Sequence, residues 1–121
     1  FIIKNKTLIT PEGRNILRGI SREYVMRTLA KEIGIRVIEK NIEQYDVYDA
    51  DEAFMTGTPF CMLPVTSLNY IPIGNGKRGP IFNKLIKTWS KKMKCDIEKQ
   101  IKVWDIKNKK LKPGPSPYKF K

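Results

Sequence analysis

The chain has no histidine, the residue type that most often moves protons or binds metals at neutral pH. Its two cysteines, Cys61 and Cys95, are too few for a disulfide framework and have no metal-ligand spacing, so we expect reduced thiols and no metal site. No apolar run is long enough to span a bilayer, and no charged-then-apolar leader precedes the first strand. We therefore expect a soluble, cytoplasmic protein without a membrane partner.

Acidic residues are scarce in one part of the chain. Residues 1–75 carry nine Lys and Arg and nine Asp and Glu, whereas residues 76–121 carry fifteen and three, so the net charge of +12 comes entirely from the second part. A basic excess can indicate nucleic-acid binding. The alternative from another functional class is therefore a non-catalytic basic module that binds nucleic acid. Its weakness is that the lysines are not interleaved with aromatic or arginine side chains.

With 121 residues, of which 40% are hydrophobic, the chain is expected to form one globular domain. The β-rich runs Phe1–Lys4 and Thr7–Thr10 predict a hairpin that turns at Asn5 and Lys6. A helical pattern follows, and Gly34 is its expected stop. The apolar side chains predicted on its buried face are Val25, Met26, Leu29 and Ile33.

A strand expected after this helix indicates an α/β arrangement. Residues 43–50 predict one or two helical turns with their aromatic side chains inward, and residues 60–67 and 69–73 predict a hairpin in which Pro64 marks an edge strand or a bulge. A helix is expected from Pro80 to Met93, followed by a short final segment at 97–104. The side chains predicted to be buried in the 80–93 helix are Ile81, Phe82, Leu85, Ile86 and Trp89.

Two places carry chemistry that suits an anion. The first is the turn at residues 56–59, where Gly57 allows close backbone approach and Thr58 offers a hydroxyl and an amide. The second is the helix start at Gly19, Ile20 and Ser21, where unpaired amides meet the positive end of the helix dipole. The alternatives are an ordinary polar turn and a serine that only caps the helix.

Four carboxylates lie close together in the sequence, between residues 46 and 52. They could form an acid/base or metal cluster, but an acidic helix face is more often simply solvated. We therefore favour the solvated interpretation. The residues are Asp46, Asp49, Asp51 and Glu52.

Five short pieces between residues 51 and 80, taken in order, resemble the C-terminal half of the class IV aminotransferases. These are the pyridoxal-phosphate enzymes of fold type IV, which include branched-chain and D-amino-acid aminotransferases. The pieces are an acidic pair at 51–52, FMTGT at 54–58, LPV at 63–65, IGNGK at 73–77 and GP at 79–80. The segment LRGISR at 17–22 is similar to the family's LPGITR, with Arg18 in place of proline and Ser21 in place of threonine.

The resemblance implies an α/β fold with a mixed sheet, or pseudo-barrel, and flanking helices. Residues 1–105 would form the C-terminal, cofactor-phosphate-binding domain. Residues 106–121 have no counterpart in the family, and their lysine- and proline-rich composition predicts a basic, flexible tail. The cofactor-binding residues that the resemblance implies are Gly19, Ile20, Ser21, Gly57 and Thr58.

The family also holds the substrate carboxylate with the amides of this threonine and of the next residue. The corresponding positions here are Thr58 and Pro59. Proline has no N–H, so one of the family's carboxylate donors is missing.

In the family, the lysine that binds the cofactor covalently and the glutamate that pairs with its ring nitrogen lie N-terminal to this region. Neither motif is present here, so we expect no catalytic residue in this chain and no activity without a missing N-terminal domain. The complete enzyme would be a homodimer that moves an amino group between an amino acid, of branched-chain type, and a 2-oxo acid. Two alternatives within the same fold are an aminodeoxychorismate-lyase-like enzyme and a D-amino-acid aminotransferase.

Overall fold

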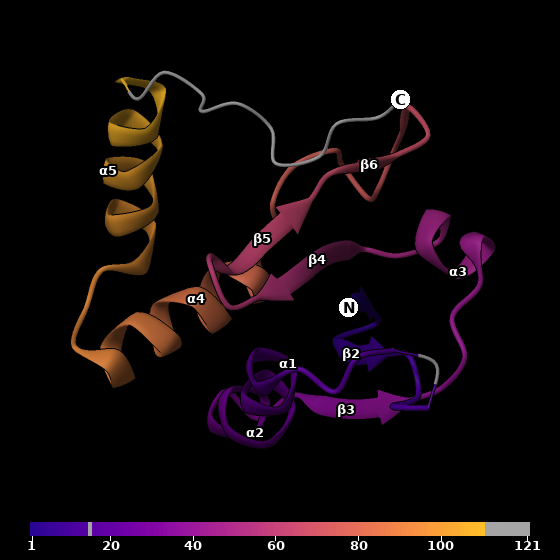
Figure 1. The fold of residues 1–121 in the computed structure, drawn as a ribbon. Helices are drawn as coiled ribbons and strands as arrows, with labels where there is room; N and C mark the ends of the chain where they lie inside the picture. Colours follow the sequence, from indigo (N-terminus) through magenta and orange to yellow (C-terminus); the bar gives the residue numbers. More distant parts are fainter. Residues whose placement is uncertain (15, 111–121) are drawn as a thin grey trace, which may run out of the picture.

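The computed structural model describes residues 1–14 and 16–110, the last three of these without their side chains. Five strands form a mixed sheet in the order β3-β2-β1-β4-β5, and two short strands, β6 and β7, form a separate pair (Figure 1). The strands are β1 (Ile2–Lys4), β2 (Thr7–Thr10), β3 (Arg36–Glu39), β4 (Glu52–Gly57), β5 (Cys61–Val65), β6 (Ser67–Leu68) and β7 (Ile71–Pro72).

The predicted hairpin of β1 and β2 is confirmed, and its turn residues Asn5 and Lys6 have φ angles of 48° and 57°. Two successive left-handed residues give the turn that suits the twist of a two-residue hairpin. Strand β3 pairs with β2 in parallel, with Leu8 opposite Val37, whereas β1, β4 and β5 pair with their neighbours in antiparallel fashion. The crossover between β2 and β3 is helical, as parallel strands require.

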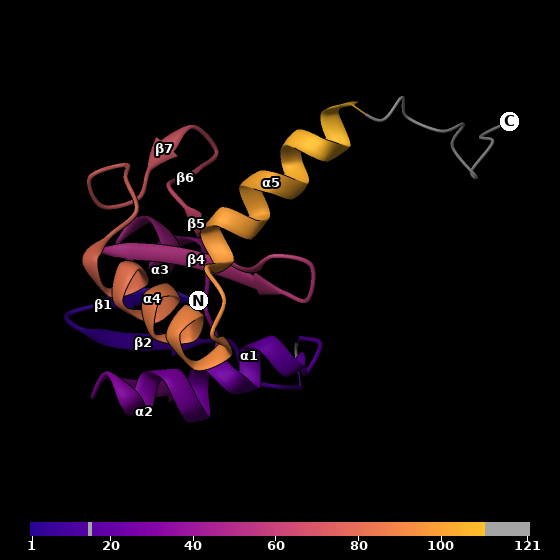
Figure 2. The same cartoon turned by 90° about the vertical axis from the view of Figure 1, so that its left-hand side faces the viewer.

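Side chains alternate along the strands and give the sheet two buried faces. One face carries Ile3, Leu8 and Phe54 and packs against the helices described below. The other face carries Ile2, Ile9 and Ala53 and is covered by helix α3 (Gln44–Tyr48) and the β6–β7 pair. Figures 1 and 2 show the sheet between these two groups of elements.

The crossover helix begins as α1 (Ile20–Tyr24), continues through a π-helical segment, η1 (Val25–Leu29), and ends as α2 (Ala30–Glu32). The predicted apolar face is inward: Val25 and Leu29 are fully buried, and Met26 and Ile33 are half-buried. Gly34 has φ +69° and ends the helix, as predicted. The π-helical segment was not predicted, because apolar spacing does not distinguish it from an α-helix.

Helix α4 (Pro80–Met93) has the predicted bounds and packs on β4 and η1. Helix α5 (Ile97–Lys110) is longer than the predicted final segment and crosses the expected boundary between residues 105 and 106. The expectation that regular structure ends near Trp104 was therefore wrong. Figure 1 shows α5 standing away from the sheet, and residues 111–121 lie outside the described part of the chain.

Two further predictions differ from the structure. Tyr45 is 77% exposed, so the aromatic side chains of α3 do not all point inward. Residues 60–67 do not pair along their length with 69–73, because β5 pairs with β4 as the sheet's edge strand and only the short β6 pairs with β7. Pro64 does lie in this edge strand, as expected.

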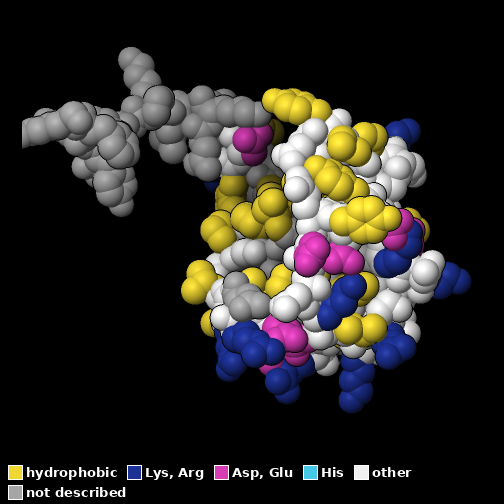
Figure 3. Space-filling model, turned by 90° about the vertical axis from the view of Figure 1, so that its right-hand side faces the viewer, with side chains coloured by type: hydrophobic (Ala, Val, Ile, Leu, Met, Phe, Trp, Pro, Cys, Tyr) yellow, Lys and Arg dark blue, Asp and Glu magenta, His cyan; other side chains and the backbone are white. Residues whose placement is uncertain are grey.

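Figure 3 shows hydrophobic side chains gathered on the face formed by α3 and the β6–β7 pair. The large hydrophobic side chains exposed on α3 and along β6, β7 and their turn are Tyr45, Tyr70 and Ile71. Within residues 1–14 and 16–110, no helix has the length and hydrophobicity needed to cross a membrane.

Candidate functional site

The helix start that was predicted to bind an anion has free donors. Gly19 is the N-cap residue of α1, with no side-chain cap, and Ser21 lies one residue inside the helix. The alternative in which Ser21 caps the helix is therefore wrong. The amides of Ile20, Ser21 and Arg22 and the Ser21 hydroxyl find no acceptor or donor in the described part of the chain. A helix start with such orphan amides favours an anionic group nearby.

The predicted turn directly follows strand β4. Gly57 is the last residue of β4, and its carbonyl accepts the Phe60 amide at 3.3 Å, which places Thr58 and Pro59 at the corner. A Cβ atom at Gly57 would lie 2.7 Å from the Phe60 ring, so a larger residue there would require the Phe60 side chain to move. The amide and hydroxyl of Thr58 have no hydrogen-bond partner among the described residues.

A cavity of about 430 Å³ joins the helix start to the turn. It is lined by all five residues that were predicted to bind the cofactor phosphate: Gly19, Ile20, Ser21, Gly57 and Thr58. Pro59 is exposed and does not line the cavity. Segments more than thirty residues apart in the sequence thus come together, although their role as phosphate ligands stays a prediction.

The cavity also contains residues that the sequence did not single out. Thr10 and Arg22 line it, and both are buried. With Phe1 as the first residue, burial together with the positive charge of Arg22 lowers the pKa of the Phe1 ammonium group from 8.0 to about 6. Arg22 adjoins Ser21 in the sequence, but nothing in the sequence indicated that its side chain turns inward.

The four clustered carboxylates are engaged by separate partner groups, except that Asp49 and Asp51 share one, Lys4. Asp46 accepts the Glu43 amide, Asp49 and Asp51 pair with Lys4, and Glu52 binds the start of α4. Among the residues that the structure describes, no three His, Cys, Asp or Glu side chains form a group that could hold a metal ion. These carboxylates therefore act in capping and surface ion pairs.

A larger cavity, of about 590 Å³, lies at the opposite end of β4, between the start of α4 and the β1–β2 turn. Although α4 begins there, its first amides are already occupied. The Glu52 carboxylate accepts the Ile81 amide at 3.0 Å and the Phe82 amide at 2.9 Å. The cavity beside Ser21 and Thr58 is thus the better anion site, since its amides and hydroxyls are free.

Comparisons with known proteins agree with this placement of elements. The family described as Amino-transferase class IV matches residues 1–68. The branched-chain-amino-acid aminotransferase of Pseudomonas aeruginosa is 44% identical over 89 residues, which are 74% of this chain and 29% of that protein. The probable branched-chain-amino-acid aminotransferase of Aquifex aeolicus is 44% identical over 86 residues, 70% of this chain and 28% of that protein. The chain thus spans less than a third of the length of these relatives.

Solved structures of branched-chain aminotransferases also match this chain over part of their length. The branched-chain amino acid aminotransferase from Escherichia coli superposes with a TM-score of 0.71 at 37% identity, over 74% of this chain and 30% of that one. The putative branched-chain amino acid aminotransferase from Thermotoga maritima gives 0.66 at 36% identity, over 72% of this chain and 32% of that one. These likenesses confirm the predicted α/β fold with a mixed sheet over the matched part. The chain belongs to the class IV aminotransferase family, resembles its branched-chain members and covers a part of their length.

Proposed function

We propose that this chain is the C-terminal, phosphate-binding part of a pyridoxal-phosphate-dependent aminotransferase. The complete enzyme moves an amino group between an amino acid of branched-chain type and a 2-oxo acid. The observation that carries the proposal is the shared cavity of Ser21 and Thr58, which gathers unpaired amides and hydroxyls from two distant segments. The branched-chain names of the relatives favour this reaction over the lyase-like and D-amino-acid alternatives.

The donors in the cavity fit a phosphate group. A phosphate dianion accepts several hydrogen bonds at once, and the amides of Ile20 and Ser21, with the hydroxyls of Ser21 and Thr58, supply them. Hydrogen bonds to a charged group are worth about 1.5 to 3 kcal/mol each. No Asp or Glu side chain is among the described residues that line the cavity; the carboxylate beside it, Glu39, is paired with Arg22.

Pyridoxal phosphate, when bound, supplies the electron sink needed for bond cleavage at the α-carbon of an amino acid. The residues of this chain would hold its phosphate and so fix the position of the ring. The covalent lysine and the partner of the ring nitrogen belong, by the family resemblance, to the N-terminal part of the enzyme. We propose that the 121 residues alone do not transaminate, and that the missing domain and a homodimer complete the site.

Cofactor binding can be tested with pyridoxamine 5′-phosphate, which has no aldehyde and so cannot react with the many surface lysines. The 121-residue chain should bind it, and both Ser21→Ala and Thr58→Val should weaken binding by on the order of tenfold each, the loss of one charged hydrogen bond. Thr66→Val, which removes a hydroxyl outside the cavity, is the control. Equal affinity in all four proteins would contradict the proposed role.

A separate proposal concerns Pro59 and the binding of the substrate carboxylate. If the Thr58 amide holds the substrate carboxylate, Pro59 cannot add the second amide that the family uses. In the complete enzyme, Pro59→Ala should then lower the KM for the amino acid several-fold while leaving affinity for pyridoxamine 5′-phosphate unchanged. A KM that stays the same would show that the carboxylate is held elsewhere.

A further inference from the structure

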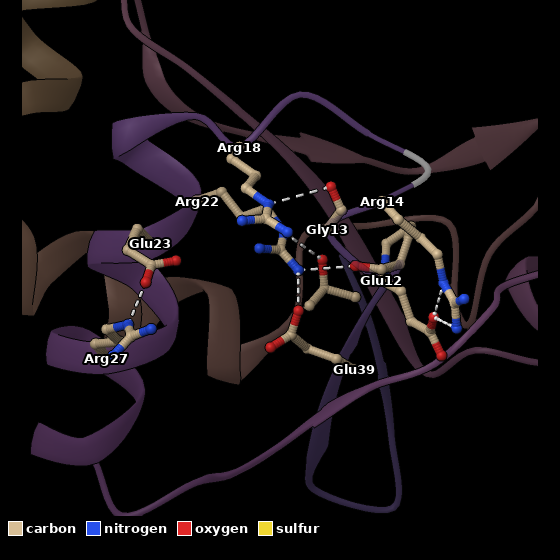
Figure 4. Close-up of polar contacts among 10 residues, drawn as sticks. Glu12, Gly13, Arg14, Arg18, Arg22, Glu23, Arg27 and Glu39 are labelled. Carbon is tan, nitrogen blue, oxygen red and sulfur yellow. Dashed lines mark hydrogen bonds and ion pairs between the residues drawn. The ribbon is translucent and has the colours of Figure 1, made fainter.

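Arg22 differs from the other arginines near the candidate site. It follows Ser21 on α1, is only 7% exposed and lines the cavity. Figure 4 shows its guanidinium group turned back toward the segment that follows β2, whereas Arg27 lies away from it beside Glu23. The exposed arginines of this region are Arg14, Arg18 and Arg27. Only Arg22 therefore brings a buried charge to the site.

Three acceptors hold the Arg22 guanidinium. Its Nε donates to the Thr10 hydroxyl at 3.2 Å, and its Nη2 donates to the Pro11 carbonyl at 2.7 Å and to the Glu39 carboxylate at 2.8 Å. Two of these acceptors are neutral, and the Glu39 side chain is 47% exposed while that of Arg22 is 8% exposed. Water screens the Glu39 carboxylate more than the Arg22 guanidinium. The Arg22–Glu39 ion pair therefore leaves a net positive potential around the buried guanidinium.

The positive potential of Arg22 extends into the cavity. Arg22 lines the cavity and is buried, so water screens its charge little. A positive charge in this position attracts an anion. Arg22 is also the only charged side chain among the described residues that line the cavity.

We propose that Arg22 is a positioning residue that gives this cavity its preference for a phosphate dianion, through its charge and without touching the phosphate. The inference rests on the proposed function, because it assigns the source of affinity at the same site. The alternative is a purely structural role, in which the hydrogen bonds of Arg22 only anchor the start of α1 to the segment after β2. The two ideas predict different responses to the removal of Glu39.

The experiment compares affinities of the 121-residue chain for pyridoxamine 5′-phosphate and for pyridoxamine, which has the same ring without the phosphate. Arg22→Met should weaken binding of the phosphate form by on the order of tenfold and leave pyridoxamine unaffected. Glu39→Gln keeps an oxygen for Nη2 and both neutral acceptors, and it removes the compensating negative charge. It should therefore tighten binding of the phosphate form, by about two- to fivefold at low salt.

Arg27→Met is the matched control, since it removes an exposed arginine of the same helix and should change neither affinity. If Arg22→Met fails to fold, Glu39→Gln still decides, because an anchoring role predicts weaker or equal binding and the electrostatic role predicts tighter binding. Equal or weaker binding in Glu39→Gln would overturn the inference about Arg22 alone. Failure of the unmodified chain to bind pyridoxamine 5′-phosphate would overturn the proposed function and, with it, this inference.

Discussion

Glu52 offers the sharpest test of how the fold holds β4, the strand that ends at the candidate site. Its side chain is 7% exposed, and its carboxylate accepts the amides of Ile81 and Phe82 at the start of α4. Two orphan donors of that helix are thus satisfied by one buried carboxylate. A Cβ atom at Gly79 would overlap this carboxylate, so Gly79 is the residue that makes room for it.

The cost of removing Glu52 follows from these contacts. Each hydrogen bond to a charged group contributes about 1.5 to 3 kcal/mol, and a donor left buried without a partner costs about 1 to 3 kcal/mol. We expect Glu52→Ala to lower the free energy of unfolding by about 3 to 5 kcal/mol. Glu52→Gln keeps one acceptor oxygen and should lose roughly half as much. Gly79→Ala should also destabilise, because the added methyl group displaces the carboxylate.

Urea unfolding followed by circular dichroism measures these differences at constant m-value. Asp49→Ala is the control, since this nearby carboxylate is 58% exposed and its ion pair with Lys4 should contribute at most about 1 kcal/mol. A loss below about 1 kcal/mol for Glu52→Ala would refute the assignment of Glu52 as the buried cap of α4.

Three further predictions concern the fold. With a free amino group at Phe1, the free energy of unfolding should rise by about 2 to 3 kcal/mol between pH 6 and 8, because the unfolded chain binds more protons than the folded one in that range. No histidine contributes there, and urea unfolding of an N-terminally acetylated chain should show no such rise; the same slope in both chains would contradict the pKa assignment. The hydrogen bond and charge of Lys92 lower the pKa of Glu32. In Lys92→Met, the pKa of Glu32 followed by NMR should therefore rise toward its ordinary range, and an unchanged pKa would exclude the pair. Gly34→Ala should cost about 1 kcal/mol in thermal or urea unfolding, because φ is +69° in otherwise open space, whereas an unchanged stability would mean that the turn relaxes.

Local sequence patterns predicted the elements whose signals lie within a few residues. The alternation in residues 2–10, the left-handed turn at Asn5 and Lys6, and the apolar spacing after Pro80 each specify one local conformation, and the structure has all three. Helix α5 was underestimated because its apolar residues Val103, Trp104 and Ile106 are partly exposed and its lysines resemble a solvated tail. Tyr45 was misplaced because a helix of five residues has too little periodicity to define a buried face.

The candidate site could be predicted in part, because some of its donors come from short local segments. Free donors at Ile20 and Ser21, and the hydroxyl in the turn at Thr58, follow from local chemistry, and the family resemblance linked the two segments. The contribution of Arg22 could not be foreseen, because its burial depends on Thr10, Pro11 and Glu39, which come from three separate parts of the chain. Long-range contacts of this kind leave no local pattern.

Chemical-shift mapping on the ¹⁵N-labelled 121-residue chain tests the central claim most directly. On addition of pyridoxamine 5′-phosphate, the account predicts that the largest shift changes fall on the amides of Ile20, Ser21 and Thr58, and that inorganic phosphate reproduces them in weaker form. Changes centred instead on the lysines of α5, or on the larger cavity near Lys6 and Lys84, would contradict the account.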